Sequence, residues 1–265
     1  MPGESNCRNP TCPCTPLRVA PARLPLWRCV SSLILWSSCL GIPAHAQTQR
    51  LGSWSILNLN LQLTDKWQIF TEGQIRSLSF YRDFHYFEVK GGVQYKLDKN
   101  FSVALAGGSY NTYSPGGSFE DPKLSDEERL WEQVTMKQYY QRVKFEHRYR
   151  AEQRWTQVGF RHRFRYRLNA VIPLGKQQQV VPGVWYLNFS NEIFFTNQAP
   201  YFERNRFFMG VGRKMTESLT LQTGYMRQFD YRLVDEIGRN FFQISFLFDL
   251  RWRENSTEKL PSHVD

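Results

Sequence analysis

Residues 142–168 read RVKFEHRYRAEQRWTQVGFRHRFRYRL and alternate charged with mostly aromatic side chains. Successive side chains of a β-strand point to opposite faces, so this period of two gives each strand one guanidinium face and one aromatic face. On a helix, the same arginines would be spread around the whole circumference. The pattern is typical of a membrane-spanning β-barrel, with lipid against the aromatic face and water or ion pairs against the charged one. The predicted charged face carries Lys144, Glu146, Arg148, Arg150, Glu152, Arg154, Arg161, Arg163, Arg165 and Arg167.

The composition fits one sizeable domain that crosses a membrane with strands. The chain has 265 residues, 15% of them aromatic, and its mean hydropathy is −0.52. After the N-terminal region, no uncharged apolar run approaches the ~18 residues that a membrane-spanning helix needs. Alternation hides the hydrophobicity of a barrel from an average over the chain, so the low value does not argue against one.

The first 46 residues are interpreted as a signal peptide. Three arginines precede an apolar stretch, Val30 to Ile42, and Ala44 and Ala46 form a small-residue cleavage site that would leave Gln47 as the first mature residue. The alternative is a first core helix of the folded domain. The basic region is long for a signal peptide, which indicates a translation start placed too early.

Cysteine and charge limit the other classes of protein. All five cysteines precede Gln47, and Cys7, Cys12 and Cys14 lack the fourth ligand of a metal site. The formal net charge of +10 would also suit a nucleic-acid-binding protein. However, an exported chain rarely meets nucleic acid, and these arginines alternate with lipid-compatible aromatics. We therefore expect no cofactor, no metal and no nucleic-acid partner.

From Leu51 onward, the chain divides into eleven alternating runs of about ten residues, the length that a tilted strand needs to cross a bilayer. Because single-chain bacterial barrels use an even number of strands, we expect ten or twelve, in an antiparallel up-and-down barrel spanning residues 47–250. Residues 251–265 are predicted to be a polar tail. Apart from the two arginine-bearing strands, the runs are Leu51–Leu63, Trp67–Phe80, His85–Leu97, Phe101–Tyr113, Glu128–Lys137, Val184–Phe195, Asn205–Lys214, Leu219–Tyr231 and Asn240–Leu250.

The longer connections are expected at 114–127, 172–183, 196–204 and 233–238, and the tight turns at 64–66, 98–100, 138–141 and 216–218. Short and long connections largely alternate, as in a meander with short periplasmic turns and longer outer loops. A soluble lipocalin-like barrel or β-sandwich in the periplasm also alternates and remains the alternative fold. Trp and Tyr residues near strand ends, as in interfacial girdles, favour the membrane barrel.

Two functions suit the charged face. In the first, ion pairs brace a closed lumen, with the arginines paired to Glu128, Glu132, Glu146, Glu152, Glu192 and Glu203. In the second, the lumen is a narrow anion-preferring channel or binds a small anionic solute. Barrels of ten to twelve strands are narrow, which favours bracing. The residues expected to line the lumen or bind a ligand are Arg148, Arg150, Arg154, Arg163, Arg165, Arg167, Glu146 and Glu152.

A membrane-embedded lipid hydrolase or acyltransferase is the enzymatic alternative. It would need a Ser–His pair with an orienting polar group near one rim. His147 and His162 lie on the aromatic faces of their strands, and the serines near His85, such as Ser77 and Ser79, form no recognisable motif. We therefore expect no enzymatic activity and no catalytic residues.

Six blocks of the sequence form a recognisable set: Gly73–Ser77, Arg129–Trp131, His147–Arg154, Phe164–Leu168, Asn191–Phe194 and Glu203–Arg206. The most specific are the HRYRxEQR and ERNR blocks. Together they resemble a family of exported Gram-negative proteins known as domain of unknown function 2490, over about residues 47–250. The resemblance implies an outer-membrane β-barrel with no established activity and carries over no catalytic residue.

The expected surroundings follow from this resemblance and from the export signal. The partners are outer-membrane lipid and the barrel-assembly machinery, and the location is the outer membrane. Barrels of this kind commonly end on an aromatic residue that the machinery recognises. In this chain Phe246 and Phe248 would have to serve internally, because a polar tail follows them.

Overall fold

The computed structural model describes residues 50–231 and 237–252 and consists of β-strands and their connections. The expected signal peptide lies outside the described residues, as does most of the expected tail. No helix in the described ranges is long and apolar enough to cross a membrane. The strands of the described part are β1 (Leu51–Gln62), β2 (Trp67–Ser79), β3 (Arg82–Lys96), β4 (Phe101–Tyr113), β5 (Lys123–Tyr140), β6 (Val143–Thr156), β7 (Gly159–Pro173), β8 (Trp185–Thr196), β9 (Phe202–Lys214), β10 (Leu219–Asp230) and β11 (Ile237–Arg251).

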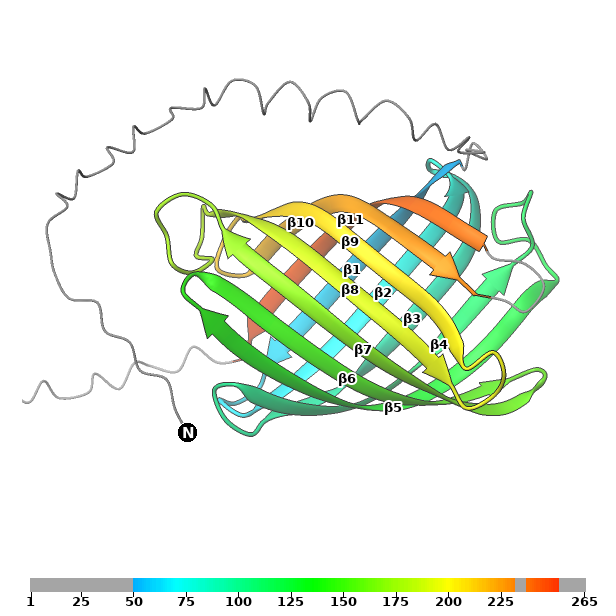
Figure 1. Cartoon of the computed structure of the whole chain (residues 1–265), viewed down its shortest axis with the longest axis horizontal. Helices are drawn as coiled ribbons and strands as arrows, with labels where there is room; N and C mark the ends of the chain where they lie inside the picture. Colours follow the sequence, from blue (N-terminus) through cyan, green and yellow to red (C-terminus); the bar gives the residue numbers. More distant parts are fainter. Residues whose placement is uncertain (1–49, 232–236, 253–265) are drawn as a thin grey trace, which may run out of the picture. The chain divides into compact units, whose positions relative to one another are not determined.

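The strands form a closed barrel in which each is antiparallel to the next along the chain (Figure 1). The pair that closes the barrel is the exception, because β1 and β11 pair in parallel, from Leu51 opposite Asn240 to Gln62 opposite Arg251. In an up-and-down meander with an odd number of strands, the first and last strands run the same way, so they can only meet in parallel. The predicted β-barrel of about ten to twelve strands is confirmed, but the expected even number, ten or twelve, was wrong. The eleven runs counted in the sequence are the strands themselves.

The two ends of the barrel are called rim 1, where β1 ends, and rim 2, where β1 begins. At rim 1, residues 141–142 join β5 to β6, and residues 174–184 form the longest connection. At rim 2, residues 157–158 join β6 to β7, and residues 114–122 join β4 to β5. Long and short connections therefore occur at both rims, instead of separating into a short-turn end and a long-loop end.

The connection after β4 is shorter than predicted, because β5 already begins at Lys123. It lies against the neighbouring hairpin. The Gly116 amide donates to Asp83 at 2.8 Å, and the Phe119 ring stacks on Phe84 at 5.8 Å between centroids. A long loop of a barrel can fold into the lumen as a plug. These contacts hold this connection on β3.

The inner face of the barrel is polar and the outer face is apolar. Buried inner side chains include Arg76, Glu88, Arg154, Arg163 and Asp230. A soluble barrel has the reverse arrangement, with apolar side chains filling the inside. Large apolar side chains exposed on the outer face include Leu57, Val89, Val93, Leu105, Leu130, Val134, Tyr149, Phe164, Phe207, Met209 and Phe246.

Polar groups on the outer face mostly bond to one another. Asn191 and Asn205 exchange side-chain hydrogen bonds of 3.2 and 3.1 Å, and His147 shares one of 2.9 Å with the Tyr166 hydroxyl. The Thr223 hydroxyl donates to a backbone carbonyl. Such pairing satisfies the polar groups without water.

Exposed aromatic side chains collect at both rims, where sequence reasoning expected interfacial girdles. At rim 1 they are Trp67, Phe101, Tyr139, Tyr140, Trp185 and Trp252. At rim 2 they are Phe80, Tyr81, Trp155, Phe160, Tyr201 and Tyr231.

Inward-facing glycines make room for aromatic rings that fill part of the lumen. A Cβ on Gly212 would lie 2.3 Å from the Tyr186 ring, and one on Gly210 would lie 2.5 Å from the Phe208 ring. Outward-facing Gly73 has nothing within 4 Å of such a Cβ. The glycines on the inner face therefore shape the interior, where rings from neighbouring strands lie over the backbone.

Candidate functional site: the charged lumen

The arginine-bearing strands place like charges directly opposite each other. In the β6–β7 register, Arg150 faces Arg165 and Arg148 faces Arg167. Directly opposed like charges destabilise a sheet. The arrangement therefore requires carboxylates from other positions on the barrel wall.

Glu152 is the central one of these carboxylates and is buried. It accepts from Nε and Nη2 of Arg163 at 2.8 and 2.6 Å and from Arg165 at 2.6 Å, and Arg150 lies 3.7 Å away. Glu192, from β8, accepts from Arg165 at 2.8 Å and from Arg148 at 2.5 Å. The opposed Arg150 and Arg165 thus both lie against Glu152, whereas Arg148 pairs with Glu192.

A second set of acids extends this arrangement toward rim 2. Glu127 accepts from Arg129 at 2.6 Å and from Arg154 at 2.7 Å. Glu203 joins Arg154 at 3.3 Å to Arg163 at 3.1 Å. The result is one continuous chain of alternating charge, here called the central network: Arg129, Glu127, Arg154, Glu203, Arg163, Glu152, Arg165, Glu192 and Arg148.

Aromatic rings extend the central network across the lumen. Phe194 is completely buried, with the guanidinium carbons of Arg165 and Arg206 at 4.6 and 4.8 Å from its ring centroid. On the opposite wall, Trp54 lies 3.6 Å from Arg76 and 5.0 Å from Arg206. Cation–π contacts of this kind are stronger when they are desolvated.

The structure places all eight residues that the sequence proposed for the lumen on the inner face. Arg148, Arg154, Arg163, Arg165 and Glu152 belong to the central network. Arg150 lies beside it, with its guanidinium 3.6 Å from the Trp131 ring and hydrogen-bonded to Gln133. Arg167 and Glu146 form a separate pair of 3.3 Å nearer rim 1.

Two of the acids expected to brace the lumen face the other way. Glu128 and Glu132 are exposed on the outer face, and Glu132 there accepts from Gln153 at 3.1 Å. They have the phase of Leu130 and Val134, so the same alternation that located the arginines could have excluded them. The inner acids that the sequence reasoning missed are Glu72, Glu88, Glu127 and Asp230, and the missed arginines are Arg76, Arg129, Arg204 and Arg206.

Two of the cavities in the lumen lie on either side of this layer of side chains. The larger, about 620 Å³, extends from mid-height to rim 1, where Asn60, Lys144 and Asp249 line it near the ends of their strands. We call it the vestibule. The smaller, about 120 Å³, lies toward rim 2 beside Arg154, and the two share Gln74, Lys90, Arg165 and Arg206 in their walls.

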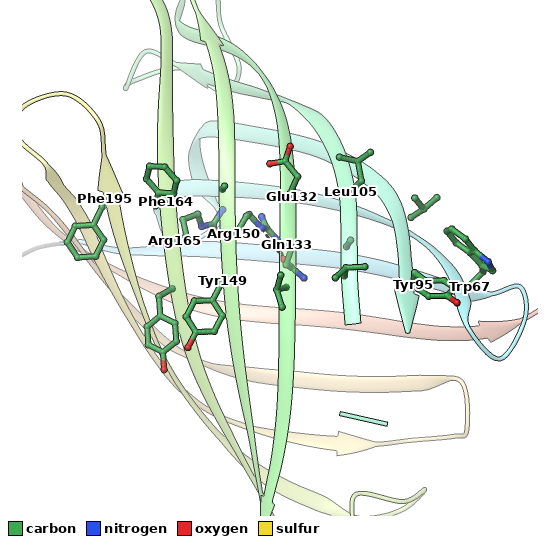
Figure 2. A pocket seen from close by; sticks show the side chains of 16 residues that line it. Trp67, Tyr95, Leu105, Glu132, Gln133, Tyr149, Arg150, Phe164, Arg165 and Phe195 are labelled. Atoms are coloured by element: carbon green, nitrogen blue, oxygen red, sulfur yellow. Dashed lines mark hydrogen bonds between the residues drawn. The ribbon is translucent and has the colours of Figure 1, made fainter. Parts of the chain in front are cut away.

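A third hollow, of about 740 Å³, lies on the outer face of the barrel. Figure 2 shows Tyr149 and Phe164 on neighbouring strands of its wall, with Glu132 beside them. Leu105 and Phe195 also line it. Its lining is mostly apolar.

The described residues do not assemble the Ser–His pair that the enzymatic alternative requires. The buried Ser77 hydroxyl lies 2.5 Å from that of Ser53 and donates to the carbonyl of Ser79. No hydrogen bond joins it to His85 in the described ranges. Nor do these ranges contain a group of three or more residues able to hold a metal ion.

Comparison with known families identifies the chain. The family model described as "Protein of unknown function (DUF2490)" matches residues 51–236, which cover most of the strands. The chain belongs to the DUF2490 family. No curated protein matches it, and no solved structure does. For this member of DUF2490, function therefore has to be argued from the lumen.

Proposed function

We propose that the chain is an outer-membrane β-barrel with a closed lumen, which acts as a structural or binding protein and not as an enzyme. Membrane insertion is supported by the inverted distribution of side chains. Charged groups are buried inside, whereas large apolar groups face outward between two aromatic rims. Hydrocarbon accepts such a surface, and a closed barrel leaves no backbone group unpaired at a sheet edge.

The observation that carries the closed state is the layer formed by the central network and its aromatic rings. Arg163 and Glu152 are almost completely buried within it, and Arg165 of the same layer lies in the walls of both the vestibule and the smaller cavity. An ion crossing the lumen would have to break several charge-assisted hydrogen bonds between buried partners, which is costly. The layer of paired side chains therefore blocks the passage of ions through the lumen.

The test is conductance of the refolded barrel, residues 47–265, in a planar bilayer under a salt gradient. The inserted protein is expected to migrate faster on gels unheated than boiled, to stay with the membranes, and to give no discrete current steps. A chain that fractionates as soluble protein and needs no detergent would contradict the membrane barrel.

An anion-preferring channel remains the second candidate, because basic side chains outnumber acidic ones in the vestibule. Discrete steps with a reversal potential favouring anions would support it and overturn the closed barrel. Charge reversal at Arg163 and Arg165 should then shift that potential.

A further inference from the structure

We infer that the vestibule binds a soluble sugar phosphate, an inference that rests on the proposed closed barrel. The volume of about 620 Å³ is within the range of small-molecule sites. Its opening at rim 1 runs along the barrel axis, and every strand of the described wall is paired with both neighbours. A water-soluble molecule can enter by this route, whereas a lipid-anchored group has no lateral entry.

One wall of the vestibule, on β5 to β7, carries an excess of positive charge near rim 1. Glu146 is its acid and pairs with both Arg167, at 3.3 Å, and Lys144, at 3.7 Å. Lys137 stands directly opposite Glu146 in the strand register but makes no ion pair within the described residues. Over the whole vestibule, the basic lining residues are Lys90, Lys137, Lys144, Arg148, Arg150, Arg165, Arg167 and Arg206, against Glu72, Glu146, Glu192 and Asp249.

The excess positive charge near rim 1 is accessible to a ligand, whereas the charged side chains of the central network are buried. The side chains of Lys144 and Arg167 are 34% and 30% exposed and share one acid, Glu146. Those of Arg163 and Arg165 are 2% and 10% exposed, and each pairs with two acids. A dianionic phosphate group would complete the charge balance of Lys137, Lys144 and Arg167, and cationic side chains bind phosphate by charge-assisted hydrogen bonds.

The opposite wall, on β1, β10 and β11, is rich in amides, and Asp249 is its one charged lining residue among those described. Asn58 and Asn60 use their Nδ2 atoms to donate to Glu72 and Asp249, which leaves their carbonyl oxygens for another donor. Gln222 accepts through Oε1 from Tyr186 and Asn188 and keeps its amide hydrogens for another acceptor. Hydroxyl groups both donate and accept, so a polyhydroxylated ligand suits this wall.

The two walls together select the class of ligand. Inorganic phosphate would use the cationic wall alone, and a neutral sugar would use the amide wall alone. A sugar phosphate spans both. The connection 174–184 contributes to the mouth: Gln178 and Gln179 line a cavity of about 360 Å³ that shares Lys144 and Asn188 with the vestibule.

The experiment is calorimetric titration of the refolded full mature chain in an oxyethylene detergent, which carries neither phosphate nor sugar. The probes are glucose 6-phosphate, glucose and inorganic phosphate at equal ionic strength. Glucose 6-phosphate should bind at least about tenfold more tightly than either of the others, since each wall adds its own hydrogen bonds.

The variant Lys137→Gln/Lys144→Gln should weaken glucose 6-phosphate binding by about tenfold or more, and Asn58→Ala should weaken it without affecting inorganic phosphate. The control is Lys66→Gln/Lys99→Gln, which removes the same two charges at the same rim but from the exposed turns after β1 and β3, and it should bind as wild type. Each variant is first checked for the heat-dependent gel shift of a folded barrel.

Equal affinity for inorganic phosphate and glucose 6-phosphate would overturn the assignment to sugar phosphates, as would the absence of binding by a folded barrel. Neither result affects the proposed closed barrel, which the conductance measurement tests separately. Conversely, a conducting barrel that binds glucose 6-phosphate would overturn the closed state and leave the binding site standing.

Discussion

Glu152 lies among three arginines of the lumen and belongs to the central network. It is only 1% exposed, and it accepts hydrogen bonds from Arg163 and Arg165 while Arg150 lies 3.7 Å away. Removing its charge would leave several guanidinium groups buried without an acid between them. Breaking a buried pair in this way is far more costly than replacing the whole set with apolar groups.

We expect Glu152→Gln to lower the free energy of unfolding by about 3 kcal/mol or more. The matched control is Glu217→Gln, which removes a carboxylate that is 81% exposed and pairs only with Lys214. Surface pairs contribute at most about 1 kcal/mol, so the control should be close to wild type. Urea titration in phospholipid vesicles measures both. Equal effects of the two substitutions would show that the network is hydrated and contributes little to stability.

Gly212 tests whether the aromatic filling of the lumen is tightly packed. The added methyl group of Gly212→Ala would meet the Tyr186 ring, whose hydroxyl donates to Gln222, so we expect a loss of about 1–3 kcal/mol. Gly73→Ala is the control, because its methyl group meets nothing within 4 Å, and it should change stability by no more than about 0.5 kcal/mol. The same urea titration gives both values. A tolerated Gly212→Ala would mean that the ring moves freely.

The faces of individual residues follow from the sequence wherever alternation is unbroken. Arg163 and Arg165 were correctly placed inward. Glu128 was wrongly placed, although its neighbours Glu127 and Arg129 carry the inward phase. Only the charge of Glu203 indicated that it faces inward. The β8–β9 register shifts between Phe194, which pairs with Arg204, and Phe195, which pairs with Phe202. Alternation cannot reveal a bulge, since the extra residue reverses the phase without changing the composition.

At the scale of elements, the connection 174–184 depends on one side chain. Arg142 donates from Nη2 to the backbone carbonyls of Pro173 and Gly175, both at 2.6 Å, and of Gln177 at 3.2 Å. Arg142 lies in the tight turn between β5 and β6, so it ties two neighbouring connections together. Backbone carbonyls that lose such a donor turn to water, and the loop loses its fixed position.

We therefore expect Arg142→Ala to increase cleavage by trypsin after Lys176 several-fold, because local opening controls proteolysis of a folded loop. Arg213→Ala is the control, since Arg213 reaches the other end of this loop through a single hydrogen bond of 3.4 Å to Gly183. Its cleavage rate after Lys176 should stay near that of wild type. An unchanged rate in Arg142→Ala would show that the loop is positioned by its packing over the vestibule instead.

The eleven runs in the sequence correspond to the eleven strands, although the even-number rule changed the predicted number, and some strand limits were missed. Each strand appears in the sequence as a run of period two. The beginning of β5 was missed because Asp126 and the neighbouring residues have the composition of a loop, whereas in the structure Lys123 pairs with Asp126 at 2.9 Å and the strand continues. Pairing with β4 supplies backbone hydrogen bonds there that outweigh the weak strand propensity of these residues.

At the scale of the whole molecule, closure was the feature that the sequence could not supply. Alternation is a local property and does not say which two strands pair to close the barrel, at what is here called the seam. The even-number rule misled the prediction, whereas the structure closes eleven strands through twelve aligned parallel pairs of β1 and β11. The consequence is topological. The described chain enters β1 at rim 2 and leaves β11 at rim 1, so an inserted barrel has Leu51 and Arg251 on opposite sides of the membrane.

Single cysteines at the two rims test this topology, because all five natural cysteines precede the expected mature chain. Val158, at rim 2, is 93% exposed, and the Glu217 side chain, at rim 1, is 81% exposed. In intact cells, a membrane-impermeant maleimide should label only one of the variants Val158→Cys and Glu217→Cys. The other should react only after the outer membrane is permeabilised.

Cysteines placed at the two ends of the seam, before β1 and after β11, then distinguish an eleven-stranded barrel from one with an even number of strands. A cysteine at Arg50, beside the first residue of β1, should have the accessibility of Val158→Cys, and one at Trp252, after β11, that of Glu217→Cys. An even-stranded barrel would give Arg50→Cys and Trp252→Cys the same accessibility. That result would contradict the parallel seam, because an inserted meander can return to its starting side only by an even number of crossings.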